Sequence, residues 1–361
     1  MTRTLRLIIG SYTDSLPHVQ ARGDGISFVD LDTESGRFTP VAVHPDIRNP
    51  SYLTLDRGLL YAVEELGADE ATLAVFACDV AAARLTQRAK VPAHGAWPCH
   101  IGLDPGGTRL FLSNYLDGSF VTWPLDGEGL PHRTPTVLRR TGRGPNPDRQ
   151  DGPHTHFALA SPDGAHVWIC DAGTDEIVRH ELAGPDAVAA VPDLVLRAPP
   201  GSLPRHMTLS RDGARLFVVS ELGNLVSTWR FGASSPELLG HVPTLAPGHA
   251  DPSSSAAIRL HPEGRFLYSS NRGDDSIAVF DTATGTGLPV FLGTVPTGGR
   301  TPREFAISDD GRTMIVAHQD SHSLTALRID TTTGALSHLG GPFTIGSPVC
   351  VAVCPSVPPA A

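Results

Sequence analysis

A strand–turn–strand pattern recurs along the whole chain, and it restricts the possible folds more than any other feature. Each copy is an apolar run, a tight turn that closes on glycine, and a second apolar run, as in "IRLHPEGRFLYSSNR" and "FAISDDGRTMIVAHQ". A repeat of about fifty residues is typical of solenoids and propellers. The closing glycines lie 47 to 57 residues apart, at Gly58, Gly107, Gly164, Gly213, Gly264 and Gly311.

Each repeat contains enough strand signals for a four-stranded sheet. Two apolar runs joined by a turn of the Pro-Asp-Gly type predict neighbouring antiparallel strands. A third segment such as "SIAVFDT" and often a fourth such as "VFLGTV" follow. Four short strands in each repeat predict one blade of a β-propeller.

The two ends of the chain supply one further blade. The N-terminal "LRLIIGSYT" resembles the second strand of a repeat, and "GISFVDLD" and "RFTPVAV" resemble its third and fourth strands. The missing first strand is "SPVCVAV" at residues 347–353. We therefore predict an all-β, seven-bladed β-propeller in which N- and C-terminal strands close one blade, leaving no open sheet edge. Residues 1–361 are expected to form a single domain.

Composition restricts the partners and the location. The formal net charge of -10 disfavours nucleic-acid binding, which needs a basic surface. No segment approaches the roughly 18 apolar residues of a membrane span, and "LRLII" is too short for a signal-peptide core. Five cysteines without a close Cys-x-x-Cys pair fit reduced thiols. We expect a cytoplasmic protein with a small-molecule partner, no nucleic acid and no membrane; the oligomeric state is unknown.

Propeller geometry nominates a site at one mouth of the central channel. The start of the first strand and the end of the second strand of each blade meet at the same face. Aligning the repeats on their turns gives two rings of side chains there. The first ring is Ser51, Cys99, His156, Arg205, Ala256, Arg303 and Val349, and the second is Tyr12, Glu65, Tyr115, Ala172, Glu221, Arg272 and Gln319.

These rings differ from blade to blade, as a site built on a repeated scaffold would. Glu221, Arg205 and Arg272 should converge with His156, since they come from three consecutive blades. The alternative is a solvated rim with structural ion pairs, in which His156 only packs or caps the backbone. A platform that binds proteins would more often present apolar or aromatic anchors.

Several segments resemble the lactonase family of seven-bladed propellers, and the resemblance covers nearly the whole chain in order. They include "IGSYT", "LYAVEE", "GPHTHFALASPDG", "LPRHM", "SSNRGDDSIAVF" and "TPREFAI". The family contains propeller-type 6-phosphogluconolactonases and the fungal carboxy-cis,cis-muconate lactonizing enzyme. The resemblance implies catalytic roles for His156, Arg205, Glu221 and Arg272, and it places His154 in the His-x-His pattern of the gluconolactonase-like branch.

One position departs from the family pattern. The family often has histidine after Pro-Arg in the segment "TPREF", where this chain has Glu304. We expect Glu304 to face away from the channel. Substrate-binding roles are expected for His154 and for the remaining polar ring residues, which are Arg303, Tyr115, Glu65, Tyr12 and Gln319.

The chemistry expected from the resemblance is hydrolysis of a sugar lactone, with 6-phosphoglucono-1,5-lactone as the leading substrate. Glu221 or His156 would activate water, and Arg205 and Arg272 would stabilise the oxyanion or hold a substrate anion. Histidine titrates near neutrality, so His156 could serve as base and then as acid. Arg303 is the spare candidate for a phosphate, which guanidinium groups bind bidentately.

Three alternatives stay open at this point. A lactonizing or lactone-opening enzyme for a carboxylated metabolite would use the same arginines, and a non-enzymatic propeller would use none of this chemistry. A metal held by His154, His156 and Glu221 is the third, but Arg205 and Arg272 would repel a cation. We therefore expect no metal and no cofactor.

Overall fold

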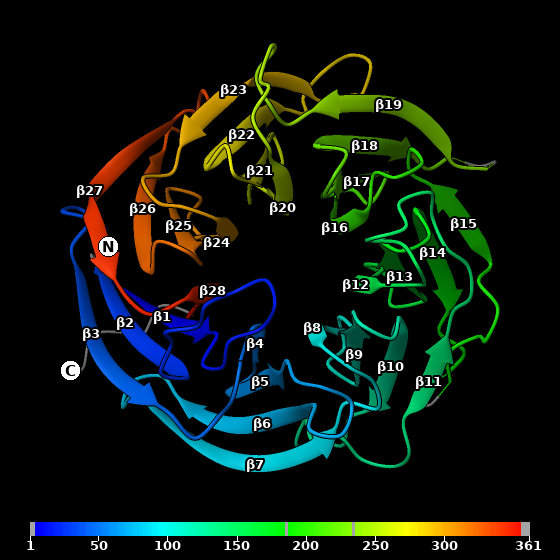
Figure 1. The fold of residues 1–361 in the computed structure, drawn as a ribbon, viewed down its shortest axis with the longest axis horizontal. Coiled ribbons are helices and arrows are strands. Elements are labelled where there is room, and N and C mark those ends of the chain that lie inside the picture. The colour runs from blue at the N-terminus through cyan, green and yellow to red at the C-terminus, as the bar shows by residue number, and fades with distance from the viewer. Residues whose placement is uncertain (1–3, 185–186, 233–234, 355–361) are drawn as a thin grey trace.

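Seven four-stranded antiparallel sheets stand around a central axis, with one strand of each sheet at the centre and one at the rim (Figure 1). The computed structural model describes residues 4–184, 187–232 and 235–354, and in these ranges every regular element is a β-strand. The prediction of an all-β, seven-bladed propeller is confirmed. Within the described ranges, no helix is long and apolar enough to span a membrane.

In six blades the strands run outward in chain order, and in the seventh β28 lies inside β1, β2 and β3. The innermost strands are β28 (Pro348–Val353), β4 (Leu53–Asp56), β8 (Pro98–Leu103), β12 (Thr155–Ala160), β16 (Pro204–Leu209), β20 (Ser254–Leu260) and β24 (Pro302–Ile307). The second strands are β1 (Thr4–Ser11), β5 (Leu59–Glu64), β9 (Arg109–Asn114), β13 (His166–Asp171), β17 (Arg215–Ser220), β21 (Phe266–Arg272) and β25 (Thr313–His318).

The two outer strands complete each blade. The third strands are β2 (Ile26–Asp32), β6 (Thr72–Asp79), β10 (Ser119–Pro124), β14 (Glu176–Glu181), β18 (Leu225–Arg230), β22 (Ser276–Asp281) and β26 (Ser323–Ile329). The rim strands are β3 (Phe38–His44), β7 (Arg84–Pro92), β11 (Thr136–Arg139), β15 (Leu194–Arg197), β19 (Glu237–Pro243), β23 (Val290–Pro296) and β27 (Leu336–Thr344).

The blade made from both ends of the chain forms as predicted. β28 pairs antiparallel with β1, with Leu7 opposite Val353 and Ile9 opposite Val351. β1 continues to β2 and β3 in the same sheet. This pairing gives the inner edge of β1 a partner and closes the ring.

The repeated turns depend on glycine. The six closing glycines have φ between 58° and 84°, in the left-handed region that other residues seldom adopt. In the turn before Gly213, the Gly213 amide donates to the carbonyl of Ser210 at 2.8 Å, and the Ser210 hydroxyl accepts from the Arg215 amide at 2.9 Å. The turn therefore fixes where each second strand begins.

The core lies between neighbouring blades. Phe111 and Phe120 of one sheet pack with Ala158, Val167 and Ile169 of the next, and all five are nearly or wholly buried. Both faces of each sheet are covered in this way, which explains why the inner and second strands are apolar along most of their length.

The ring of residues at the channel mouth coincides with β-bulges. On β16, Pro204 pairs with Ser220 and His206 pairs with Val219, so Arg205 between them has no partner on β17. A bulge of this kind redirects side chains, and bulges are frequent beside active sites. The same interruption of the ladder occurs at Cys99, His156, Arg303 and Val349.

The bulges make one sequence expectation wrong. Strict alternation along a strand would turn Glu304 away from the channel, because Arg303 points into it. The bulge at Arg303 disturbs this alternation. Glu304 instead contacts Arg259 of β20 in the neighbouring blade and His206 of β16 two blades away.

Candidate active site

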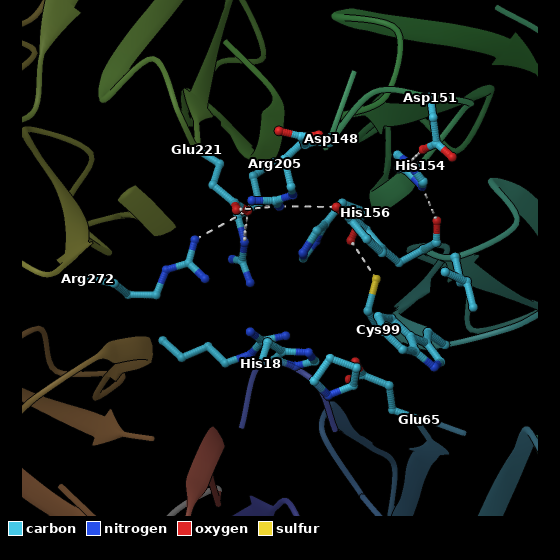
Figure 2. A pocket seen from close by; sticks show the side chains of 16 residues that line it. His18, Glu65, Cys99, Asp148, Asp151, His154, His156, Arg205, Glu221 and Arg272 are labelled. Atoms are coloured by element: carbon cyan, nitrogen blue, oxygen red, sulfur yellow. Dashed lines mark hydrogen bonds and ion pairs between the residues drawn. The ribbon is translucent and has the colours of Figure 1, made fainter. Parts of the chain in front are cut away.

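A pocket of about 500 Å³ lies at the channel mouth (Figure 2). The inner strands and the ends of the second strands supply most of its polar lining, and loops supply the remainder. Its charged, histidine, cysteine and tyrosine residues are His18, Glu65, Cys99, Tyr115, Asp148, Arg149, Asp151, His154, His156, Arg205, Glu221, Arg272 and Arg303.

Three arginines surround the carboxylate of Glu221. Arg149 Nη2 lies 2.8 Å from Oε1, while Arg205 Nε and Arg272 Nη2 lie 3.4 Å and 3.3 Å from Oε2. Arg149 Nη2 also donates to the Tyr115 hydroxyl at 3.1 Å. The predicted convergence of Arg205, Glu221 and Arg272 is thus present in the structure.

This environment decides the protonation of Glu221. Burial alone would raise its pKa, but the charges of Arg272, Arg149 and Arg205 outweigh burial and hold the pKa well below its ordinary value. Glu221 is therefore an ionised carboxylate of low basicity. Its physical effect is to hold several guanidinium groups together in a space where they would otherwise repel one another.

His156 is neutral because burial dominates its protonation, whereas neighbouring charges dominate that of Glu221. Burial, reinforced by the charge of Arg205, lowers the pKa of His156 well below its ordinary value. Its Nδ1 is buried and has no hydrogen-bond partner. A neutral imidazole can accept a proton, so His156 is a better candidate than Glu221 for a general base.

His154 is held in a fixed orientation beside His156. Its ring stacks on Tyr115 with centroids 4.7 Å apart. Nδ1 donates to the carbonyl of Tyr115 at 2.8 Å, and Nε2 lies 3.2 Å from Asp151 Oδ1. In the described part of the chain, no three His, Cys, Asp or Glu residues are placed to hold a metal ion.

Arg303 differs from the other arginines of the pocket. Its guanidinium lies 5.5 Å from the ring centroid of Tyr12, a cation–π contact. Within the described ranges, no carboxylate lies at ion-pair distance from it, whereas Arg149, Arg205 and Arg272 share Glu221. The positive charge of Arg303 is therefore available to a ligand.

The wall opposite Arg205 and Glu221 contains His18 (Figure 2). The Tyr12 hydroxyl donates to Glu65 Oε2 at 2.9 Å and lies 3.3 Å from His18 Nε2, so His18 donates to the tyrosine oxygen. Partial burial and the charges of Arg303 and Arg272 lower the pKa of His18 to about 4. His18 is thus neutral in this wall.

Cys99 lines the pocket as an uncharged thiol. Its Sγ lies 3.6 Å from the carbonyl oxygens of Ser113 and His156. Burial raises the pKa of the thiol well above its ordinary value. Since the thiolate is the nucleophilic form, Cys99 is not suited to covalent catalysis.

Most of the predicted site residues face the pocket, and two do not. Tyr12 is fully buried behind Glu65, and Gln319 donates to the His18 carbonyl at 3.4 Å and to Asp320 at 3.0 Å. The remaining predictions, all of which line the pocket, are His154, His156, Arg205, Glu221, Arg272, Arg303, Tyr115 and Glu65.

Sequence analysis missed two functional candidates because both lie on loops outside the repeat. Arg149 belongs to the loop between β11 and β12. Gln150 anchors that loop, since it is fully buried and donates to the carbonyl of Ala172 at 2.9 Å. The available signal was an arginine in a long loop directly before "DGPHTH". His18 lies on the β1–β2 loop and had no comparable signal.

A comparison with known families agrees with this arrangement. The family described as lactonase, seven-bladed beta-propeller, matches residues 6–353. The chain belongs to this lactonase family. It is therefore a lactonase enzyme, and the alternative of a non-enzymatic binding platform falls away.

Relatives of this lactonase include proteins named 6-phosphogluconolactonase. The one from Bacillus subtilis is 28% identical over 347 residues, which cover 95% of this chain and 96% of the relative. The one from Formosa agariphila is 31% identical, covering 92% of this chain and 95% of the relative. A solved periplasmic gluconolactonase of Pseudomonas aeruginosa has a TM-score of 0.88 and 27% identity, covering 98% of this chain and 100% of that structure.

Three buried histidines of this lactonase predict acid sensitivity. Burial is the main cause that lowers the pKa values of His100, His156 and His206 well below normal. As pH falls through about 6.5, the unfolded chain takes up these protons and the folded protein does not. The free energy of unfolding should then fall by about 1.4 kcal/mol per pH unit for each proton. Urea unfolding at pH 8, 6.5 and 5.5 measures how steeply the free energy of unfolding falls with pH. His206→Gln should reduce this slope by the contribution of about one proton. A free energy of unfolding that does not change with pH contradicts the prediction.

Proposed function

We propose that this lactonase hydrolyses the ring ester of a phosphorylated sugar lactone, with 6-phosphoglucono-1,5-lactone as the substrate. The names of the Bacillus and Formosa relatives support this choice. The observation that carries it is the guanidinium of Arg303, which lies in the pocket without a carboxylate partner in the described ranges. Such a group favours an anionic ligand, and phosphate suits it well.

In the proposed reaction, water attacks the ring carbonyl and gives a tetrahedral oxyanion. His156 takes a proton from the attacking water and returns it to the ring oxygen when the carbon–oxygen bond breaks. The product is the open-chain hydroxy acid. Arg205 and Arg272 face the pocket with positive charge and stabilise the oxyanion.

The proposal changes the role expected for Glu221. A carboxylate shared by three arginines is a poor base, so its part is to keep those arginines in place before substrate arrives. An anionic substrate adds negative charge near His156. It thereby offsets the effect of Arg205 and raises the pKa of His156 toward the working pH.

The first experiment follows proton release from freshly made 6-phosphogluconolactone, with unphosphorylated gluconolactone and a carboxylated muconolactone beside it. Acceleration of the phosphorylated lactone, unchanged after exhaustive chelation, supports the proposal. Acceleration of the carboxylated lactone alone assigns Arg303 to a carboxylate instead. Loss of activity on chelation would restore a metal at His154 and His156.

Replacing Arg303 with glutamine tests the phosphate assignment. We expect KM for the phosphorylated lactone to rise by about tenfold or more, since a charge-assisted hydrogen bond is lost. For unphosphorylated gluconolactone, kcat/KM should change less than about twofold. Initial rates on both lactones measure this selectivity, and equal losses on the two would show that Arg303 serves the carbonyl.

The cytoplasmic location expected from the sequence stays a prediction.

A further inference from the structure

A second layer of polar side chains lies in the central channel, one residue further along the inner strands than the pocket ring. His100 stacks on Phe157 with centroids 3.9 Å apart, and Phe157 lies 4.7 Å from His206. Tyr52 and Glu304 belong to the same layer. All five residues are buried, and sequence analysis gave none of them a role.

His206 connects this layer to the pocket. Its Nε2 lies 3.1 Å from Arg205 Nη1, which also donates to the carbonyl of Ala256 at 2.8 Å. Arginine is always a donor, so His206 Nε2 must be the acceptor. Neutral His206 therefore has its proton on Nδ1, and burial, which lowers its pKa well below normal, keeps it neutral.

Glu304 lies on the other side of the His206 ring. Its Oε2 is 3.8 Å from His206 Nδ1, and its Oε1 accepts from Arg259 at 3.1 Å and from the Phe305 amide at 3.1 Å. A buried negative charge this close to Nδ1 favours a proton on that nitrogen. His206 Nδ1 makes no hydrogen bond within the described part of the chain, so Glu304 acts on it through its charge at 3.8 Å. The four side chains therefore lie in the order Arg259, Glu304, His206 and Arg205, with hydrogen bonds at the first and last steps.

We propose that Glu304 and His206 are positioning residues for Arg205: Glu304 keeps the proton of His206 on Nδ1, and His206 holds the Arg205 guanidinium through Nε2. Two acceptors, His206 and the carbonyl of Ala256, then fix Nη1. The other face of the guanidinium is directed at Glu221 and the pocket. Without His206 as acceptor, the guanidinium would lose one of the groups that orient it.

Glu304→Gln is the informative change, because it keeps the shape of the side chain and touches neither Arg205 nor the pocket. Its amide can place a donor toward Nδ1, which would drive the His206 proton to Nε2. Two donors, Nε2–H and Arg205 Nη1, would then face each other. The guanidinium of Arg205 must then move, although Arg205 itself is not replaced.

The tautomer can be observed directly in the full-length protein labelled with ¹⁵N-histidine. The His206 signals are identified by their absence in His206→Gln. We expect a protonated Nδ1 and an unprotonated Nε2 in the wild type at pH 7, and a proton on Nε2 in Glu304→Gln. A wild-type proton on Nε2 would overturn the proposal. This readout needs no substrate, so it stands apart from the activity on which the proposed function rests.

Activity supplies the second test. Glu304→Gln should lower kcat/KM for the phosphorylated lactone about tenfold in the wild type and less than about twofold in an Arg205→Ala background. Tyr52→Phe is the matched control, since it removes a 3.3 Å contact to Arg259 in the same layer without touching His206; it should change kcat/KM less than about twofold. Equal losses from Glu304→Gln in both backgrounds would overturn the proposal. A wild type that opens no lactone would overturn the proposed function instead.

Discussion

Replacing His156 with alanine is expected to lower kcat for lactone opening by about 10²-fold or more. His156 is a neutral imidazole of the pocket whose buried Nδ1 has no hydrogen-bond partner among the described residues, whereas the Nε2 of the other neutral imidazole, His18, donates to Tyr12. KM for the phosphorylated lactone should change less than about threefold, because Arg303 is intact. Proton-release rates over a range of substrate concentrations separate the two constants.

The pH profile provides the check on this assignment. In the wild type, kcat should fall at acid pH as His156 becomes protonated, and this limb should disappear in His156→Ala. His154→Ala is the matched control: it removes the neighbouring histidine, which directly precedes β12, and should keep the limb. A loss below threefold in His156→Ala would show that His156 only packs.

Glu221→Gln is expected to have the second large effect, on stability as well as activity. The change leaves Arg149, Arg205 and Arg272 in the pocket without their shared carboxylate. Removing one partner of a buried ion cluster typically costs about 3–5 kcal/mol of the free energy of unfolding. Activity should fall about 10²-fold, since the oxyanion-binding groups separate. Urea unfolding and initial rates measure the two losses.

The two roles considered for Glu221 give different results. If Glu221 were the base, Glu221→Gln would abolish activity, and added sulfate would restore none of it. If Glu221 organises the arginines, added sulfate should stabilise Glu221→Gln more than the wild type, because the anion replaces the lost charge. Glu221→Asp is the matched control, which keeps the charge and should retain most of the stability.

The fold was predictable because it depends on local patterns repeated many times. Glycines with positive φ close each turn, and the apolar runs on either side of them form the two inner strands. The terminal blade followed from one missing strand, which pairs with β1 as expected. Repetition allowed a weak signal in one repeat, such as the shortened turn at Gly58, to be confirmed by the others.

The site was predictable only where its residues occupy positions of the repeat. Arg205, Glu221 and Arg272 were found by alignment of the blades, but the sequence does not show that Glu221 is shared by three arginines. Arg149 could not be found in the same way, since the loop between β11 and β12 is longer than the equivalent loops of the other blades and does not align with them. Glu304 was expected to face away from the channel because the expectation assumed strict alternation along the strand, and the sequence does not reveal the bulge at Arg303.

At the bulges, the residues that line the pocket are not the residues whose backbones pair to form the sheets. Residues such as Arg205 and Cys99 make no backbone ladder contact of their own, since the register passes over them. A substitution there alters the pocket and leaves the pairing of the inner strands intact. Proteins of this kind can therefore acquire new substrates by single replacements at these few positions. Cys99, an uncharged pocket residue at a bulge, is the natural place to begin such a change.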